Sequence, residues 1–134
     1  MAISLEQTKA VLAAAERRAV ELNVPSVIAV MDDAANLKGL LRMDETSILC
    51  LQAALGKAYT SAVWDGPTAD LLDQCQPGQP LYGLQSWNNQ LIIFGGGIPL
   101  RERGKLVGAV GVSGGTVEED VVIAEAAVAG FVGG

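Results

Sequence analysis

The sequence predicts one α+β domain in which helices pack against a central antiparallel sheet. The expected elements follow the order helix, hairpin, helices, strands, helix, and strand pairs joined by tight turns favour an antiparallel sheet. The regular alternation of strand and helix that is typical of parallel βαβ folds is absent. The chain has 134 residues, of which 50% are hydrophobic and only 4% aromatic, and this length suits a single domain over residues 1–134. The core must therefore consist mostly of small aliphatic residues, which favour close packing of the elements.

The first helix has a start and a stop that can be read directly from the sequence. Ser4 and Gln7 form a capping box at its beginning, and apolar residues then recur at helical spacing. The helix is expected to end near Asn23, because Pro25 disfavours helical geometry in the residue before it.

A hairpin and two further helices follow. Residues 26–31 and 37–42 are rich in strand-forming residues, and turn residues occupy 32–36 between them. Residues 48–63, rich in Ala and Leu, predict the second helix. Residues 68–74 predict a short third helix that begins after a proline.

The second half of the chain adds two strands. Residues 90–94 predict a strand, residues 101–105 a charged turn, and residues 106–112 another strand. Gly108 and Gly111 lie inside the last of these, and a glycine within a strand indicates that another backbone or a ligand approaches closely.

A glycine-rich bend, Ser113-Gly114-Gly115-Thr116, leads from that strand into the final helix. Thr116 and Glu119 form a second capping box, so the helix is expected to run to about residue 129. Free backbone N–H groups at a helix start attract anions, but three consecutive acidic residues occupy this first turn. The chain also lacks the GxGxxG and GxxxxGK[ST] patterns, so nucleotide binding is not expected.

An earlier glycine bend ends a long stretch without charge, because residues 74–100 contain no acidic or basic side chain. Such a stretch is expected to lie against a ligand or a subunit; the alternative is an ordinary buried loop followed by a core strand. The run Gly95-Gly96-Gly97 precedes Pro99 and Arg101. It is either a pocket wall, with Arg101 pairing a ligand carboxylate, or a tight chain reversal.

Lys57 lies among apolar neighbours in the second helix. It points inward toward a ligand or extends its amine to water, and the second is the expectation. If the protein is an enzyme, Glu119 or Asp120 is the candidate base, and the amides of the glycine bend are the candidate oxyanion site.

Charge and composition exclude several classes of function. The net charge of −6 argues against nucleic acid as a partner. The absence of histidine excludes Ser-His-Asp catalysis and histidine-based zinc or iron sites, and no metal site is expected.

No secretory signal or membrane-spanning apolar segment is seen, and Cys50 and Cys75 are interpreted as free thiols, so we expect a cytoplasmic protein. Soft or phenolic side chains that could ligate haem iron include Met31, Met43, Cys50, Cys75 and Tyr82.

Four segments together resemble the GlcG/HbpS-like family: GKAYTSAVWDGPTADL, QPGQPLYGLQ, FGGGIPL and GAVGVSGGTVEED. The family includes the C-terminal domain of PduO-type corrinoid adenosyltransferases. Within the family, the sequence most resembles stand-alone OrfY-type proteins that accompany B12-dependent glycerol or diol metabolism. The resemblance covers nearly the whole chain. It implies a profilin-like fold with about five strands, homo-oligomers such as tetramers or octamers, and binding of haem or a corrinoid (cobalamin). One subgroup ligates haem through histidine, a mode that this chain does not share.

Three hypotheses follow. The first is a non-catalytic tetrapyrrole-binding or accessory protein; the second is an enzyme acting on a small organic acid or aldehyde; the third is a structural oligomer without a ligand. The first requires the uncharged loops and the two glycine bends to surround a shared hollow. Its predicted ligand-binding residues are Lys57, Tyr82, Gly95, Gly96, Gly97, Pro99, Arg101, Ser113, Gly114, Gly115 and Thr116.

Overall fold

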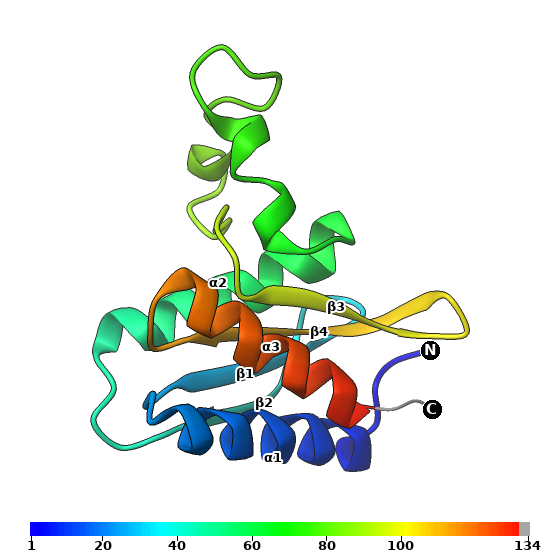
Figure 1. Cartoon of the computed structure of the whole chain (residues 1–134). Coiled ribbons are helices and arrows are strands. Elements are labelled where there is room, and N and C mark those ends of the chain that lie inside the picture. The colour runs from blue at the N-terminus through cyan, green and yellow to red at the C-terminus, as the bar shows by residue number, and fades with distance from the viewer. Residues whose placement is uncertain (132–134) are drawn as a thin grey trace.

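The computed structural model describes residues 1–131, which build one four-stranded sheet (Figure 1). The strands are β1 (Val27–Asp32), β2 (Leu37–Arg42), β3 (Gly97–Glu102) and β4 (Lys105–Ser113). Their order across the sheet is β2-β1-β4-β3, and every neighbouring pair is antiparallel. The predicted α+β class and the predicted first hairpin are confirmed.

Within the described part of the chain, three α-helices cover the two faces of this sheet. Helices α1 (Leu5–Leu22) and α3 (Val117–Phe131) lie side by side on one face, and α2 (Ile48–Trp64) lies on the other (Figure 1). Both predicted capping boxes are present, at Ser4 and at Thr116. Within residues 1–131 no helix combines the length and the apolar run needed to cross a membrane.

Strand β1 is buried on both faces and divides its side chains between the two helix layers. Ile28 and Val30 pack into the core beneath α1 and α3, whereas Ala29 and Met31 pack against α2. This period of two is the geometry of a strand. Because the core beneath α2 is built largely of alanine, the helix approaches the sheet closely.

A pair of glycines marks the point of nearest approach. Gly97 of β3 and Gly111 of β4 are directly opposite each other in the ladder. A Cβ at Gly111 would collide with the Ala54 carbonyl oxygen and the Ala58 nitrogen, and one at Gly97 with the Lys57 carbonyl oxygen. The backbone that the strand glycines admit is therefore that of α2.

The third strand differs from the sequence prediction. The expected strand over residues 90–94 is wrong: the Ile92 N–H donates to Thr60 Oγ1 (2.9 Å) and residues 90–96 form a loop. The sheet within residues 1–131 therefore has four strands, slightly fewer than the expected number of about five. Strand β3 begins only at Gly97 and includes Pro99 and Arg101. Since β3 is the edge strand, it is the place where a sheet accommodates proline.

Between α2 and β3 the chain leaves the layered body. The helix expected over residues 68–74 is instead two 3₁₀ turns, Thr68–Asp70 and Asp73–Cys75, and a third follows at Leu84–Ser86. Residues 72–90, which we call the projecting segment, extend away from the sheet (Figure 1). A small cluster of Leu71, Cys75 and Ile93 packs at its base.

Candidate functional site

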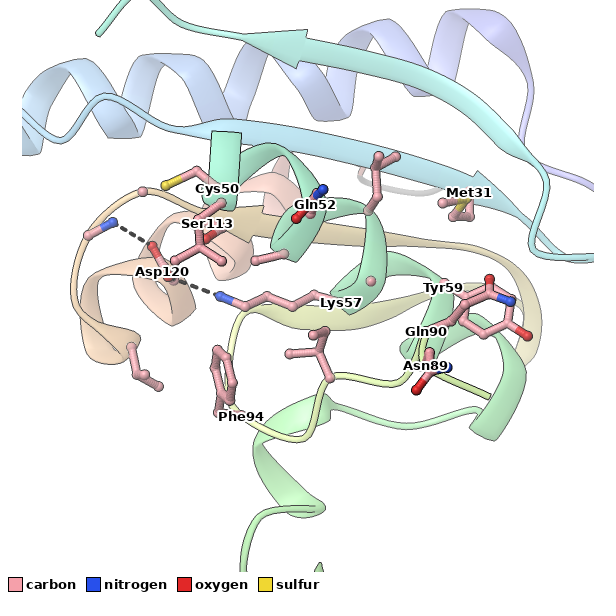
Figure 2. A pocket seen from close by; sticks show the side chains of 18 of the residues that line it. Met31, Cys50, Gln52, Lys57, Tyr59, Asn89, Gln90, Phe94, Ser113 and Asp120 are labelled. Carbon is pink, nitrogen blue, oxygen red and sulfur yellow. Dashed lines mark hydrogen bonds and ion pairs between the residues drawn. The ribbon is translucent and has the colours of Figure 1, made fainter. Parts of the chain in front are cut away.

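A cavity of about 890 Å³ runs along one face of α2 (Figure 2). Its walls come from α2, the end of β1, residues 89–94, and residues 113–117 at the junction of β4 and α3. Much of the lining is apolar, contributed by Met31, Leu49, Ala53, Leu55, Ile92 and Phe94. The α2 residues on this surface include Leu49, Gln52, Ala53 and Gly56, which are spaced as one face of a helix.

Lys57 is one of the residues that line the cavity, and it is fully buried. Its Nζ donates to the carbonyl oxygen of Val112 (2.8 Å) and to Asp120 Oδ2 (3.0 Å), and lies 5.3 Å from the centroid of the Phe94 ring. Burial lowers the pKa of Lys57, and the neighbouring Asp120 carboxylate opposes this effect. The expectation that Lys57 extends to water is wrong, because its carboxylate and carbonyl partners are inside.

Asp120 joins the same network from the first turn of α3. The residue is 3% exposed, and Oδ1 accepts the Gly115 N–H (3.0 Å) while Oδ2 accepts from Lys57. Glu119 Oε1 accepts the Thr116 N–H (2.8 Å) as a helix cap. The two candidate bases therefore engage two of the amides that were expected to form an oxyanion site, and this arrangement does not favour the enzyme hypothesis.

Lys57 also connects the two glycine bends. The Val112 N–H donates to the Gly96 carbonyl (2.9 Å), so the bends are adjacent. Gly96 has φ +127°, and a Cβ there would lie 2.8 Å from Lys57 Nζ. Only glycine suits this position, since the backbone conformation and the contact both disfavour a side chain.

The two bends border different hollows. Ser113, Gly114 and Gly115 line the large cavity. Gly96 and Gly97 instead line a smaller hollow of about 430 Å³ beside α3. The prediction that both bends surround one hollow is therefore correct only in part. The two bends meet at Lys57, but Phe94, and not the triple glycine, lines the large cavity.

The other predicted site residues lie outside the large cavity. Tyr82 is 65% exposed on the projecting segment, and Pro99 belongs to the edge strand. Thr116 serves as the cap of α3. Arg101 Nη2 donates to the carboxylate of Asp65, so its guanidinium has a partner within the chain.

Sequence reasoning missed several lining residues, notably Gln52, Tyr59, Asn89 and Gln90. Figure 2 shows Tyr59, Asn89 and Gln90 gathered at the end of the cavity opposite Asp120. The helical spacing of residues 49, 52, 53 and 56 was visible in the sequence, but nothing there indicated which face of α2 stays uncovered.

We expect Arg101→Ala to leave ligand binding unchanged and to reduce the free energy of unfolding by less than about 1 kcal/mol, because exposed ion pairs contribute little. Urea denaturation and ligand titration of this variant check both points. A large loss of ligand affinity in this variant would show instead that Arg101 contributes to ligand binding.

The chain matches known proteins over nearly its full length. A family model described as "Haem degrading protein HbpS-like" matches residues 3–129. The chain is 45% identical to an uncharacterized 15.0 kDa protein of the dhaT-dhaS intergenic region of Citrobacter freundii, over 93% of this chain and 89% of that protein. It is 38% identical to the corrinoid adenosyltransferase PduO of the same species over 96% of this chain, but it spans only 39% of that longer protein.

Solved structures agree with this relationship. Klebsiella pneumoniae protein ORFY superposes with a TM-score of 0.94 at 42% identity, covering 96% of this chain and 90% of the other. A PduOC:Heme complex superposes with a TM-score of 0.94 at 36% identity, covering 97% and 95%. Together with the matching fold and the family model, these similarities show that the chain belongs to the HbpS-like family.

Proposed function

We propose that this domain binds a tetrapyrrole, either haem or a corrinoid, in the cavity along α2 and acts as a non-catalytic binding or accessory protein. The observation that carries the proposal is the size and lining of that cavity. Its volume of about 890 Å³ lies near the upper end of small-molecule pockets, roughly 300–1,000 Å³. The relatives whose names mention heme and corrinoid support this ligand class.

The donor groups in the cavity fit a metallated ring. The sequence contains no histidine, but Cys50, Met31 and Tyr59, which carry a thiol, a thioether and a phenol, are among the residues that line the cavity. Cysteine thiolate, methionine and tyrosine are all known haem-iron ligands. A bound metallated ring would supply redox chemistry, and the one or two side chains that would hold its metal are drawn from these three. Met43, Cys75 and Tyr82 do not line this cavity.

We further propose that the chain assembles into a homo-oligomer, either a tetramer or an octamer. We place this oligomer in the cytoplasm and link it to B12-dependent diol or glycerol metabolism. Exposed apolar side chains support self-association: Ile48 and Leu49 at the start of α2 are 77% and 70% exposed, and Trp87 on the projecting segment is 76% exposed. Light scattering on the purified chain measures the assembly directly.

Filling the cavity tests the binding proposal. Ala53→Trp places an indole in the cavity, and we expect the affinity for the bound tetrapyrrole to fall at least about tenfold, because the ring and the indole compete for one space. Absorbance titration with haemin and with cobalamin measures the effect. Ala13→Trp is the matched control, since Ala13 is exposed on α1.

Two results would contradict the proposal. One is a wild-type chain that leaves both absorption spectra unchanged. The other is equal binding by Ala53→Trp and Ala13→Trp, with thermal unfolding confirming that both variants are folded.

A further inference from the structure

We infer that the cavity selects an amide-bearing, carboxylate-poor tetrapyrrole, which is the corrinoid class, over a dicarboxylate porphyrin such as haem. This inference rests on the proposed function and makes it more specific. Its basis is the charge of the cavity wall and the identity of the polar groups on it.

The cavity wall carries no net charge. Among the described residues that line it, Lys57 and Asp120 are the charged ones, and they pair with each other at 3.0 Å. Lys57 Nζ donates a second hydrogen bond to the carbonyl oxygen of Val112, and the Lys57 side chain is 1% exposed. A ligand carboxylate therefore meets no available cation on this wall.

The residues that flank the lining are acidic. Asp32 and Asp33 lie just before Ala35, and Glu118 and Glu119 lie just after Val117. The remaining eight Lys and Arg residues of the chain belong to α1, β2 and the β3–β4 hairpin, and none of them lines the cavity. With an overall charge of −6, the protein repels an approaching dianion.

The uncharged polar groups on the wall complement carboxamides. Gln52, Asn89 and Gln90 are exposed residues that line the cavity, and each side chain both donates and accepts hydrogen bonds. A ligand amide satisfies both functions, whereas a carboxylate only accepts. Figure 2 shows Asn89 and Gln90 at one end of the cavity and Gln52 on another part of its wall, so amides at different edges of a ring find partners.

A matched pair of corrin rings tests the inference. The full chain is titrated by calorimetry with dicyanocobinamide, whose periphery carries amides, and with the dicyano form of cobyrinic acid, which has the same ring and the same cyanide ligands but carboxylates in place of the amides. Haemin is titrated in parallel. We expect the amide ring to bind at least about tenfold more tightly than either carboxylate-bearing ring, because each carboxylate meets repulsion and no counter-charge. Added salt should narrow the gap.

Two lysine variants locate the effect. Gln52→Lys adds a cation to the wall, and we expect it to tighten binding of cobyrinic acid and haemin roughly tenfold. Ala13→Lys adds the same charge on α1, away from the cavity, and should change little.

The outcomes separate the inference from the function on which it rests. Tighter binding of haemin or cobyrinic acid than of dicyanocobinamide overturns the inference and leaves tetrapyrrole binding intact. Equal responses of Gln52→Lys and Ala13→Lys overturn it as well, because the selectivity would then not arise at this wall. No binding of any of the three rings overturns both.

Discussion

Asp120→Asn is expected to reduce the free energy of unfolding by about 3–5 kcal/mol at neutral pH, because removing one partner of a buried ion pair leaves the other charge uncompensated. Lys57 would keep its carbonyl partner Val112 but lose the carboxylate at 3.0 Å. The amide that replaces the carboxylate cannot accept from both Lys57 and the N–H of Gly115 without turning an NH₂ group toward one of them. Urea denaturation measures the loss, which is large against a typical domain stability of roughly 5–15 kcal/mol.

The loss should shrink as the pH rises. Burial lowers the pKa of Lys57 from its ordinary value of 10.5, and Asp120 acts in the opposite direction, so Asp120→Asn lowers that pKa further. A lysine whose pKa is lower in the folded state destabilises the fold at pH values below that folded pKa. The penalty disappears as the pH approaches the unfolded value of about 10.5. The difference between the wild type and Asp120→Asn should therefore be largest at pH 7 and smaller at pH 10.

The double variant Lys57→Met/Asp120→Leu is the control for this prediction. It removes both charges and preserves much of the side-chain volume. A protein in which a buried ion pair is replaced by apolar residues of similar volume often loses little stability. The double variant's loss of unfolding free energy should be clearly smaller than the sum of the losses in the single variants Lys57→Met and Asp120→Leu, although the Val112 carbonyl and the Gly115 N–H remain without these partners. A pH-independent loss in Asp120→Asn, or additive losses in the double variant, would show that shape rather than charge is what matters here.

Gly111→Ala is expected to reduce the free energy of unfolding by about 3 kcal/mol, at the upper end of overpacking effects. The added methyl group would meet the carbonyl oxygen of Ala54 and the nitrogen of Ala58. Both are backbone atoms within α2, so neither can swing aside as a flexible side chain would. The helix must move away from β4, which also disturbs the wall of the cavity. Urea denaturation and absorbance titration of the same variant measure both consequences.

A substitution at a different glycine serves as the control. Gly104 lies in the turn between β3 and β4 with φ +79°, and no atom lies within 4 Å of the position a Cβ would take. Gly104→Asn should be nearly neutral, because asparagine tolerates the left-handed conformation. Similar losses in Gly104→Asn and Gly111→Ala would refute the explanation by close backbone approach.

Local signals in the chain predicted most of the elements correctly. Capping residues located the starts of α1 and α3, and alternating apolar residues around turn chemistry located the first hairpin. These features depend on residues a few positions apart, so they are legible before any tertiary contact is known. Strand β3 was misplaced because its neighbour β4 and the side chain of Thr60, both distant in sequence, decide which residues join the sheet.

The residues that line the cavity could be predicted only in part from the sequence. Ser113, Gly114 and Gly115 were expected and line the cavity, and Lys57 was named but expected to reach water. Arg101 was named as a candidate partner for a ligand carboxylate, and in the structure its guanidinium pairs with Asp65. A lysine among apolar neighbours looks the same in sequence whether it faces solvent or a buried carboxylate 63 positions away.

The sequence by itself determined the α+β class, the family resemblance, the exclusion of histidine chemistry and the acidic character of the chain, because composition and short-range patterns carry this information. Only the tertiary structure decided that α2 rests on the Gly97–Gly111 pair, that Lys57 and Asp120 neutralise each other, and that one face of α2 stays uncovered to form the cavity. The physical reason is that close approach, charge pairing and an open cavity are relations between residues far apart in the chain. No local pattern encodes them.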